Sequence, residues 1–554
     1  MDNNRIKKLD QILQKQINNQ INNYPFFFNF IHNNKKNSIY FVETSIFEKE
    51  EYAKYRQEFF QKKKLNSFTK LEKSSIGSML GMTIGDAIGS RVEFFPLNYN
   101  FKGITGMGES KNGIFKLNPG QWTDDTSMGL CISDSLIEKK GEFDPRDIMM
   151  RFILWWYFGY NNAFRFDKKR ESRHSVGLGG NISGSLYKYI KDEGKDAYTT
   201  YGNKKTSGNG SIMRNAPIPL CYFRNIKKAL YFAKKQSLIT HQGDEAAGCC
   251  QLMTFIIIKI LQLKIGQNLN NEKNEKNSKI KDKTKDLDNS NFIIVEHKNN
   301  ILTNENKEKI KLKDILDDLK DFNCECKSVN YLAQSKMENN DINRNWNWKE
   351  KNFHYSEERA KKKPGYIGSY CMDGLAMALH VLYYTDSFQS AILKAVNLCG
   401  DADSVGSVVG QIAGAFYEYD SIPPDWIKEV NKWDKDEIAL RGFILCQLNE
   451  EEKEFKNVET KENIDQGNMA IGNINEIPEN GIVIDKAKKI NGIRPYIDET
   501  KLNNNTENTN VISKLERNQN PERVETKNNR CFDCCFRYSR NTRSKSCPCD
   551  CICF

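Results

Sequence analysis

The sequence Gly400-Asp401-Ala402-Asp403-Ser404-Val405-Gly406-Ser407-Val408-Val409-Gly410-Gln411-Ile412-Ala413-Gly414-Ala415 joins a polar turn to a run of small, apolar residues. Residues 389–398 before it have an apolar helical pattern, so we expect one helix to end before the turn and another to begin after it. Two carboxylates and a hydroxyl would then lie at the start of a buried helix. Such oxygen ligands suit a divalent cation and are costly to bury without one.

A second stretch rich in small residues lies at 75–89, where Gly or Ala recurs about every four residues. Glycines on one helical face reduce helix propensity, and this cost is understandable if another backbone must approach closely. Tight helix packing is the simplest interpretation of this pattern. Just after it, Glu93 is a candidate for an inward-facing carboxylate.

A second acidic cluster, Thr123-Asp124-Asp125-Thr126, opens the apolar helical pattern of residues 129–136. Taken alone, it is an ordinary helix N-terminus, where acidic residues interact favourably with the helix dipole. It repeats, however, the combination of a hydroxyl and two carboxylates seen at 401–404. Two such clusters could share cations if their helices lie side by side.

Two loops rich in Gly, Asn and Ser follow, at residues 177–186 and 207–219. Their composition suits backbone N–H groups that face an anion near a helix N-terminus. Neither has the spacing of a P-loop or a dinucleotide-binding fingerprint, so plain turns are the simpler interpretation. Further on, His241 either positions a substrate or makes a structural hydrogen bond.

The bulk composition excludes several classes of protein. The 554 residues carry a formal charge of only +11, and no basic stripe alternates with aromatic residues, so we expect no nucleic-acid surface. No run approaches the length of a membrane-spanning helix, and no signal-peptide pattern opens the chain. Cysteines scattered through apolar helical patterns favour a reducing, cytoplasmic location.

Composition also divides the chain into parts. Residues 1–73 form an Asn/Lys-rich leader, helical over about 48–64, and residues 74–448 form the main domain. Within it, residues 264–363 are low in complexity and are expected to be a surface insertion. Residues 449–530 look like a polar linker, and 531–554 form a Cys-rich tail.

The tail admits three interpretations: a zinc site, a lipidated anchor or an unmodified disordered segment. Its cysteines lack the usual paired spacing of zinc ligands. Its last residues, Cys551-Ile552-Cys553-Phe554, fit a prenylation box with basic residues upstream. Lipid and basic residues together would hold the protein peripherally on a membrane.

Five motifs, in this order, resemble signatures of the ADP-ribosylglycohydrolase family. They are Gly85-Asp86-Ala87 with Glu93, Trp122-Thr123-Asp124-Asp125-Thr126, Gly208-Asn209-Gly210-Ser211-Ile212-Met213-Arg214, Thr240-His241 and Gly400-Asp401-Ala402-Asp403-Ser404. Each motif is weak alone, but their order over about residues 75–448 is specific. The resemblance implies a compact, all-α, orthogonal helical domain, which we expect to be a monomer with disordered flanks and a long polar insertion.

The resemblance also implies a binuclear centre with two divalent cations, Mg²⁺ or Mn²⁺. Its implied ligands are Thr123, Asp124, Asp125, Asp401, Asp403 and Ser404. Catalytic roles are implied for Asp124, Asp125 and Glu93, with the general base left open. The implied substrate-binding residues are Gly179, Gly180, Asn181, Gly208, Asn209, Gly210, Ser211, Met213, His241 and Tyr370. The glycine-rich loops would hold diphosphate and ribose, His241 would line the phosphate side, and Tyr370 would stack near adenine.

Three positions depart from the family pattern. Ser404 stands where Thr is usual and keeps the hydroxyl but not the rigidity of a β-branched side chain. Ser369 stands in place of a common Gly and Gly374 in place of a common Thr, and both positions belong to the adenine end of the implied site.

The implied function is release of ADP-ribose from a modified protein side chain or a small ADP-ribosyl compound. Such cleavage passes through an oxocarbenium-like state, which needs the ribose held and a water activated, and two hard cations do both. Residues 210–217 resemble the bacterial arginine-specific members more than the serine- and polymer-cleaving ones, so the resemblance implies an arginine linkage. The alternatives are a catalytically silent ADP-ribose-binding module and a crystallin-like structural protein.

Overall fold

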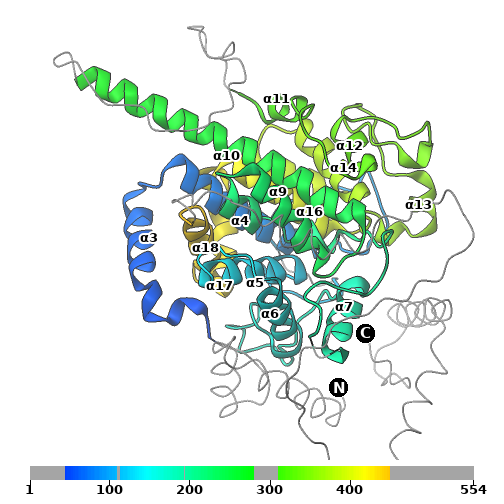
Figure 1. Cartoon of the computed structure of the whole chain (residues 1–554), viewed down its shortest axis with the longest axis horizontal. Helices are drawn as coiled ribbons and strands as arrows, with labels where there is room; N and C mark the ends of the chain where they lie inside the picture. The colour runs from blue at the N-terminus through cyan, green and yellow to red at the C-terminus, as the bar shows by residue number, and fades with distance from the viewer. Residues whose placement is uncertain (1–43, 109–112, 193, 280–309, 449–554) are drawn as a thin grey trace, which may run out of the picture. The chain divides into compact units, whose positions relative to one another are not determined.

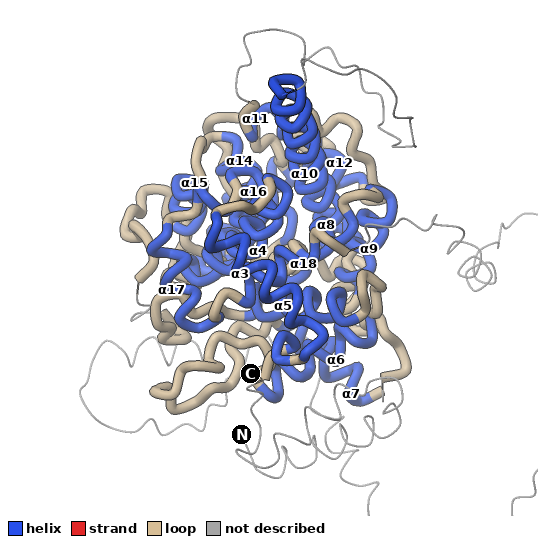
Figure 2. The backbone as a smooth tube through the Cα atoms, turned by 90° about the vertical axis from the view of Figure 1, so that its left-hand side faces the viewer, coloured by secondary structure: helices blue, strands red, loops and turns tan. Residues whose placement is uncertain are grey.

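The computed structural model describes residues 44–448 except 109–112, 193 and 280–309, and for 267–279 it describes the backbone only. All of these residues belong to one compact unit, residues 8–453. Figures 1 and 2 show helices joined by loops and no strand in this described part, which confirms the predicted all-α class. Predictions for residues 1–43, the linker and the tail with Cys551 lie outside the described residues.

The helices and their bounds are as follows. The α-helices are α3 (Ala53–Leu65), α4 (Lys70–Gly89), α5 (Asp124–Glu138), α6 (Pro145–Phe158), α7 (Gly180–Lys191), α8 (Pro217–Tyr222), α9 (Ile226–Leu238), α10 (Asp244–Lys279), α11 (Leu312–Asp317), α12 (Lys327–Ala333), α13 (Glu357–Lys362), α14 (Cys371–Tyr383), α15 (Phe388–Val396), α16 (Ala402–Tyr417), α17 (Pro424–Asp434) and α18 (Glu437–Leu445). Short 3₁₀ turns are η1 (Ile46–Glu48), η2 (Glu50–Tyr52), η3 (Asn209–Ser211), η4 (Ile342–Arg344), η5 (Pro364–Tyr366) and η6 (Tyr419–Ser421).

The two helices rich in small residues, α4 and α16, pack against each other in the middle of the unit (Figure 1). Their glycines meet in antiparallel order, because a Cβ placed on Gly81 would lie 2.0 Å from the carbonyl oxygen of Gly410. Similarly, a Cβ on Gly85 would lie 2.0 Å from the carbonyl oxygen of Gly406. Only glycine permits so close an approach. The packing therefore places the end of α4 beside the start of α16, where Asp403 lies.

Residues 310–363 bury several apolar side chains in the core, which differs from the expectation of a surface insertion. Trp346 and Trp348 in this range are 1% and 0% exposed. Trp348 donates a hydrogen bond from Nε1 to the carbonyl of Leu332 at 2.7 Å, and its own carbonyl lies 2.8 Å from Nδ1 of His380 on α14. A few well-placed apolar residues are thus enough to anchor a segment whose overall composition is polar.

Helix α10 contains a longer apolar run than we expected from the sequence. By length and composition alone, residues 244–266 could cross a membrane, so the expectation that no run approaches this length is wrong here. Inside the protein, however, 78% of the most apolar window is buried. Core helices of soluble proteins pass the same test, so this stretch is weak evidence of a membrane span.

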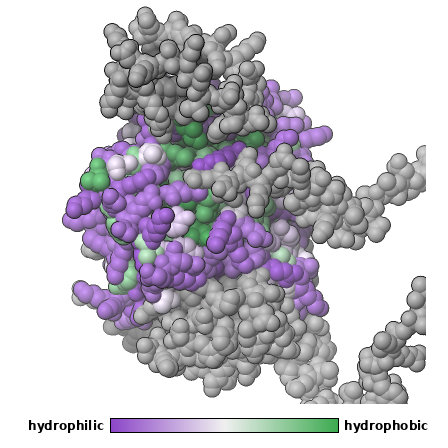
Figure 3. Space-filling view, turned by 60° about the vertical axis from the view of Figure 1, so that its left-hand side comes forward, coloured by the Kyte–Doolittle hydropathy of each residue, from purple (hydrophilic) through white to green (hydrophobic). Residues whose placement is uncertain are grey.

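The segment before α4 belongs to the folded unit. Phe47 and Phe59 are buried in the core, and α3 matches the helix expected over about 48–64. Figure 3 shows the side of the molecule on which α3 lies: hydrophilic residues cover most of the described surface, and hydrophobic residues are visible near its middle.

Candidate functional site

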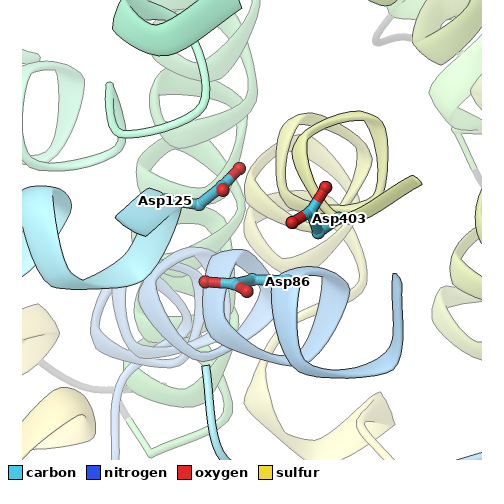
Figure 4. A group of neighbouring side chains, drawn as sticks. All are labelled: Asp86, Asp125 and Asp403. Atoms are coloured by element: carbon cyan, nitrogen blue, oxygen red, sulfur yellow. The ribbon is translucent and has the colours of Figure 1, made fainter. Parts of the chain in front are cut away.

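Three buried carboxylates meet where α4, α5 and α16 come together. Asp86, Asp125 and Asp403 each offer one oxygen, and these oxygens lie within 4.8 Å of one another (Figure 4). Asp125 and Asp403 come from the two acidic clusters at helix starts. The structure therefore brings together the two clusters that the sequence analysis expects to share a site.

Asp86 holds the start of α5 in place. Its carboxylate accepts hydrogen bonds from the backbone N–H groups of Thr123 and Thr126, at 2.9 and 3.0 Å, and from both hydroxyls, at 2.8 and 2.7 Å. The N-cap residue of α5, Thr123, makes no side-chain cap of its own, so Asp86 supplies the missing acceptor. The sequence analysis gave Asp86 no role, although a carboxylate inside a glycine-rich apolar helix is a recognisable signal.

Glu93 and Asp401 reach the cluster through a short backbone pairing. The N–H of Phe94 donates to the carbonyl of Gly400 at 2.8 Å, and the N–H of Gly400 donates to the carbonyl of Phe95 at 2.8 Å. Both Phe94, with φ 62°, and Gly400, with φ 70°, have left-handed backbone conformations. This bend, strained at Phe94, sets Glu93 against the carboxylates at the start of α16.

The carboxyl groups repel one another and are shielded from water. Burial, followed by neighbouring carboxylates, raises the pKa values of Glu93, Asp124, Asp125 and Asp403 well above their ordinary range. Burial also raises the pKa of Asp86, to about 6, against the opposing effect of its hydrogen bonds. Raised values of this kind are typical of functional sites.

The donor set fits a hard divalent cation. Among the described residues, no ion pair with a lysine or arginine reaches these carboxylates, and Glu93 Oε2 and Asp125 Oδ1 are buried without a hydrogen-bond partner. Buried carboxylate oxygens need a compensating positive charge, and oxygen-rich sites are those that Mg²⁺ and Mn²⁺ prefer.

Of the two hydroxyl residues in the predicted ligand set, Thr123 places its hydroxyl in the acidic cluster and Ser404 does not. Thr123 Oγ1 donates to Asp86 and lies 3.4 Å from oxygens of both Asp125 and Asp403, so it belongs to the cluster. Ser404 donates its backbone N–H to Asp403 at 2.9 Å, whereas its hydroxyl contacts the sulfur of Met213 at 3.6 Å. The backbone of Ser404 thus orients Asp403.

The first glycine-rich loop lies against the acidic cluster. Gly177 has φ 93°, and a Cβ placed on it would lie 2.1 Å from Oδ1 of Asp124. Gly179 is the N-cap of α7, and a Cβ on Gly180, its first residue, would meet no atom within 4 Å. The Nδ2 atom of Asn181 would lie 3.0 Å from a Cβ on Gly208. The two predicted loops therefore adjoin each other.

The second loop is tied to the acidic cluster through Asn209. Its side-chain Nδ2 donates to Asp401 Oδ2 and to the carbonyl of Gly368, both at 3.2 Å. Its backbone N–H donates to the carbonyl of Ser369 at 2.9 Å. Ser211, in contrast, is fully buried and accepts a hydrogen bond from Ser237 at 2.9 Å, so its hydroxyl faces the core.

Tyr370 adjoins this loop and contacts α10 and residues from 310–363. Its hydroxyl donates to Glu245 at 2.5 Å and accepts from Arg344 at 3.1 Å. The guanidinium of Arg359 lies 5.4 Å from the centre of its ring. Sequence reasoning missed Arg344 and Arg359 because both lie in the range taken for an insertion. Stacking of Tyr370 near adenine stays a prediction.

His241 is buried beside the second loop. Its Nδ1 atom lies 2.8 Å from the hydroxyl of Thr240. Burial, with a smaller effect from the positive charge of Arg214, lowers its pKa to about 3, so the ring is neutral at physiological pH. A Cβ on Gly210 would lie 3.2 Å from Nε2, so this atom lies close to the turn.

Comparison with known proteins shows where the sequence is similar. The model of the ADP-ribosylglycohydrolase family matches residues 68–453. ADP-ribosylarginine hydrolase Tri1 of Pseudomonas putida is 28% identical over 356 residues, which cover 64% of this chain and 73% of that protein. ADP-ribosyl-[dinitrogen reductase] glycohydrolase of Rhodospirillum rubrum is 24% identical and covers 68% and 96%.

Two further similarities are to a vertebrate hydrolase and to a solved structure. ADP-ribosylhydrolase ARH3 of Danio rerio is 24% identical over 393 residues, which cover 67% of this chain and 90% of that protein. A solved chain of an "ADP-ribosylglycohydrolase-related protein complex" has 24% identity and a TM-score of 0.45, and the match covers 68% of this chain and 99% of that chain.

Proposed function

Because the chain belongs to the ADP-ribosylglycohydrolase family of glycosidic-bond hydrolases, we propose that it cleaves the bond between ADP-ribose and a modified protein side chain. The observation that carries this proposal is the group of buried carboxylates at the start of α5 and α16, set beside two glycine-rich loops. Oxygen ligands on one side and anion-binding turns on the other match the two halves of an ADP-ribosyl substrate, its reacting ribose and its diphosphate.

We further propose that the carboxylates work with two divalent cations, Mg²⁺ or Mn²⁺. The residues that would hold them are Thr123, Asp124, Asp125, Asp401, Asp403 and Ser404, with Asp86 as an added candidate because its oxygen lies within 4.8 Å of those of Asp125 and Asp403. When bound, such cations supply anchoring of ribose hydroxyls and activation of a water molecule.

The residues of the chain itself supply positioning and proton transfer. Gly180 and Gly208, in the two adjoining loops, carry no Cβ, which leaves their backbone open to the approach of a diphosphate. Asp124, Asp125 and Glu93 are the proposed proton-transfer groups. Their raised pKa values favour a site in which one carboxyl group holds a proton while another accepts one.

We favour arginine as the modified side chain. One support is that residues 210–217 resemble the arginine-specific members of the family. The other is the names of two relatives, an ADP-ribosylarginine hydrolase and an ADP-ribosyl-[dinitrogen reductase] glycohydrolase. The similarity to ARH3, at 24% identity, is the reason to test other linkages in the same experiment.

We also propose a reducing, cytoplasmic setting for this reaction. None of the nine cysteines in the described residues forms a disulfide, and seven of them are buried. Buried thiols in apolar surroundings are inert and act as small hydrophobic residues.

The test is a release assay on arginine-, serine- and polymer-linked ADP-ribose, with and without Mg²⁺ or Mn²⁺. We expect cation-dependent release, fastest from arginine, and a loss of about 100-fold or more in Asp124→Asn and Asp403→Asn. Asp420→Asn, which alters an exposed ion pair with Lys73, is the matched control and should retain activity. Absence of release from every substrate would refute the function, and release unaffected by both site substitutions would refute the site.

A further inference from the structure

Arg214 is a buried cation whose hydrogen bonds lead toward His241. Its Nη2 donates to the hydroxyl of Thr240 at 2.7 Å and to the carbonyl of Gln236 at 3.2 Å. Its guanidinium also lies 4.5 Å from the centre of the Phe152 ring, and no carboxylate pairs with it among the described residues. A guanidinium can only donate hydrogen bonds. The Thr240 oxygen therefore acts as an acceptor toward Arg214.

The hydroxyl hydrogen of Thr240 then has one available acceptor among the described residues. Within the described residues, the only hydrogen-bond partners of Thr240 Oγ1 are Arg214 and Nδ1 of His241, the latter at 2.8 Å. Thr240 is fully buried, so a hydroxyl hydrogen without an acceptor would cost free energy. The hydrogen is therefore donated to Nδ1. A neutral imidazole whose Nδ1 accepts a hydrogen bond carries its proton on Nε2.

The Nε2 atom faces the second glycine-rich loop. A Cβ placed on Gly208 or Gly210 would lie 3.4 or 3.2 Å from it. In the described part of the chain, no hydrogen bond of His241 uses Nε2. The Nδ1 atom of this buried ring already accepts a hydrogen bond, whereas its Nε2–H makes none among the described residues. The Nε2–H is therefore suited to donate to a ligand atom at the loop.

We propose that Arg214, acting through Thr240, fixes His241 in the tautomer protonated on Nε2, and that His241 therefore acts as a hydrogen-bond donor at the phosphate-side position that the resemblance implies for it. Arg214 and Thr240 are then positioning residues, and His241 is a binding residue. The identity of the ligand as an ADP-ribosyl diphosphate rests on the proposed function, whereas the tautomer does not.

The tautomer can be measured in the whole protein by NMR with ¹⁵N-labelled histidine. The chain has six histidines, and the signals of His241 are those missing from His241→Gln. We expect the ¹⁵N shift of Nδ1 to be that of an unprotonated nitrogen and the shift of Nε2 that of a protonated one. The reverse assignment would overturn the proposal, even if every substitution were to impair folding.

Two substitutions at Thr240 test the part played by the hydroxyl. Thr240→Val should lose the tautomer preference and bind ADP-ribose about tenfold more weakly by calorimetry, the effect of weakening one hydrogen bond to a charged oxygen. Thr240→Ser keeps the hydroxyl and should resemble the wild type in both measurements. An unchanged tautomer in Thr240→Val would refute control by Arg214 and Thr240.

The same measurements separate this inference from the proposed function. Nε2 protonation together with tight ADP-ribose binding, but without hydrolysis of any substrate, would refute the proposed function and leave the role of His241 standing. Hydrolysis of a substrate by a protein whose His241 is protonated on Nδ1 would support the proposed function and refute the proposed role of His241.

Discussion

Single residues in this site serve folding and chemistry at once, and Asp86 is the clearest case. The same carboxylate accepts hydrogen bonds from four donor groups that hold the first turn of α5, and it offers an oxygen to the acidic cluster. Burial raises its pKa to about 6, yet its hydrogen bonds favour the charged form. Its stabilising and its functional roles therefore depend on the same two oxygens.

Substitution of Asp86 should separate these two roles. We expect Asp86→Ala to lower the free energy of unfolding by about 3 kcal/mol, because it leaves buried donors on Thr123 and Thr126 without an acceptor. Asp86→Asn keeps one acceptor oxygen and should lose less stability, but it should still impair cation binding. Urea unfolding with a chelator present checks the first effect. Equal midpoints for Asp86→Ala and the wild type would contradict it.

At the scale of helices, the close approach of α4 and α16 decides where the carboxylates lie. A Cβ on Gly410 would lie 1.9 Å from the carbonyl oxygen of Gly81, so Gly410→Ala must push the two helices apart. We expect a loss of about 2 kcal/mol in stability, together with lower activity as Asp403 moves away from Asp86.

The matched control for this prediction is Gly266→Ala on α10. A Cβ at Gly266 meets no atom within 4 Å, and alanine is the better helix former, so this variant should gain up to about 1 kcal/mol. Thermal unfolding of both variants measures the difference. Equal melting temperatures would show that the α4–α16 contact is looser than described.

The segment from η4 to α13 gives a second prediction at this scale, because it holds the Tyr370 ring. Arg344 bonds the Tyr370 hydroxyl and pairs with Glu245 and Glu338 at 2.5 and 2.6 Å. Arg344→Met should therefore raise the KM for an ADP-ribosyl substrate about tenfold and change kcat little, as expected when uniform binding is lost.

Lys361→Met is the control for Arg344→Met. Lys361 is exposed on α13, and within the described residues its one ion pair is a surface pair with Glu357. Such pairs contribute little, so both kinetic constants should stay near those of the wild type. A fall in kcat with unchanged KM for Arg344→Met would place this segment in the reacting part of the site instead.

For the whole molecule, the buried carboxyl groups link stability to pH. Their folded pKa values are raised above the unfolded values, so the native protein binds more protons than the unfolded chain at intermediate pH. Their contribution to stability is therefore greatest below the ordinary carboxyl range, about pH 4, and falls as pH rises through the folded values, about 6 for Asp86.

A bound divalent cation should reverse this loss. At about 100 times its Kd, Mn²⁺ should add about 2.7 kcal/mol to the free energy of unfolding. The rise in Tm should be larger at pH 8 than at pH 5, because protons compete with the cation for the carboxylates. Asp403→Asn should show a much smaller rise. An equal rise at both pH values would argue that the cation binds elsewhere.

Much of the site was accessible from sequence because its parts are local. The clusters at 123–125 and 401–404 each lie at the start of a helix, where capping residues and apolar periodicity are legible within a few residues. The order of the five motifs pointed to the family that the comparison shows. Composition misled us over 310–363, because an average over many polar residues hides the few that anchor the segment, such as Trp346 and Trp348.

Sequence by itself determined the helical class and the two acidic clusters at helix starts, one of which holds Asp401 and Asp403. It also determined the glycine-rich loops that accompany them. Only the tertiary structure decided that Asp86 joins Asp125 and Asp403 and that Arg214 reaches His241 through Thr240. The physical reason is the distance along the chain over which each interaction acts. Helix propensity and capping act within a turn or two of the chain. Which carboxylates become neighbours depends on how α4, α5 and α16 pack, and α16 begins only at Ala402, far along the chain from α4 and α5, which end at Gly89 and Glu138.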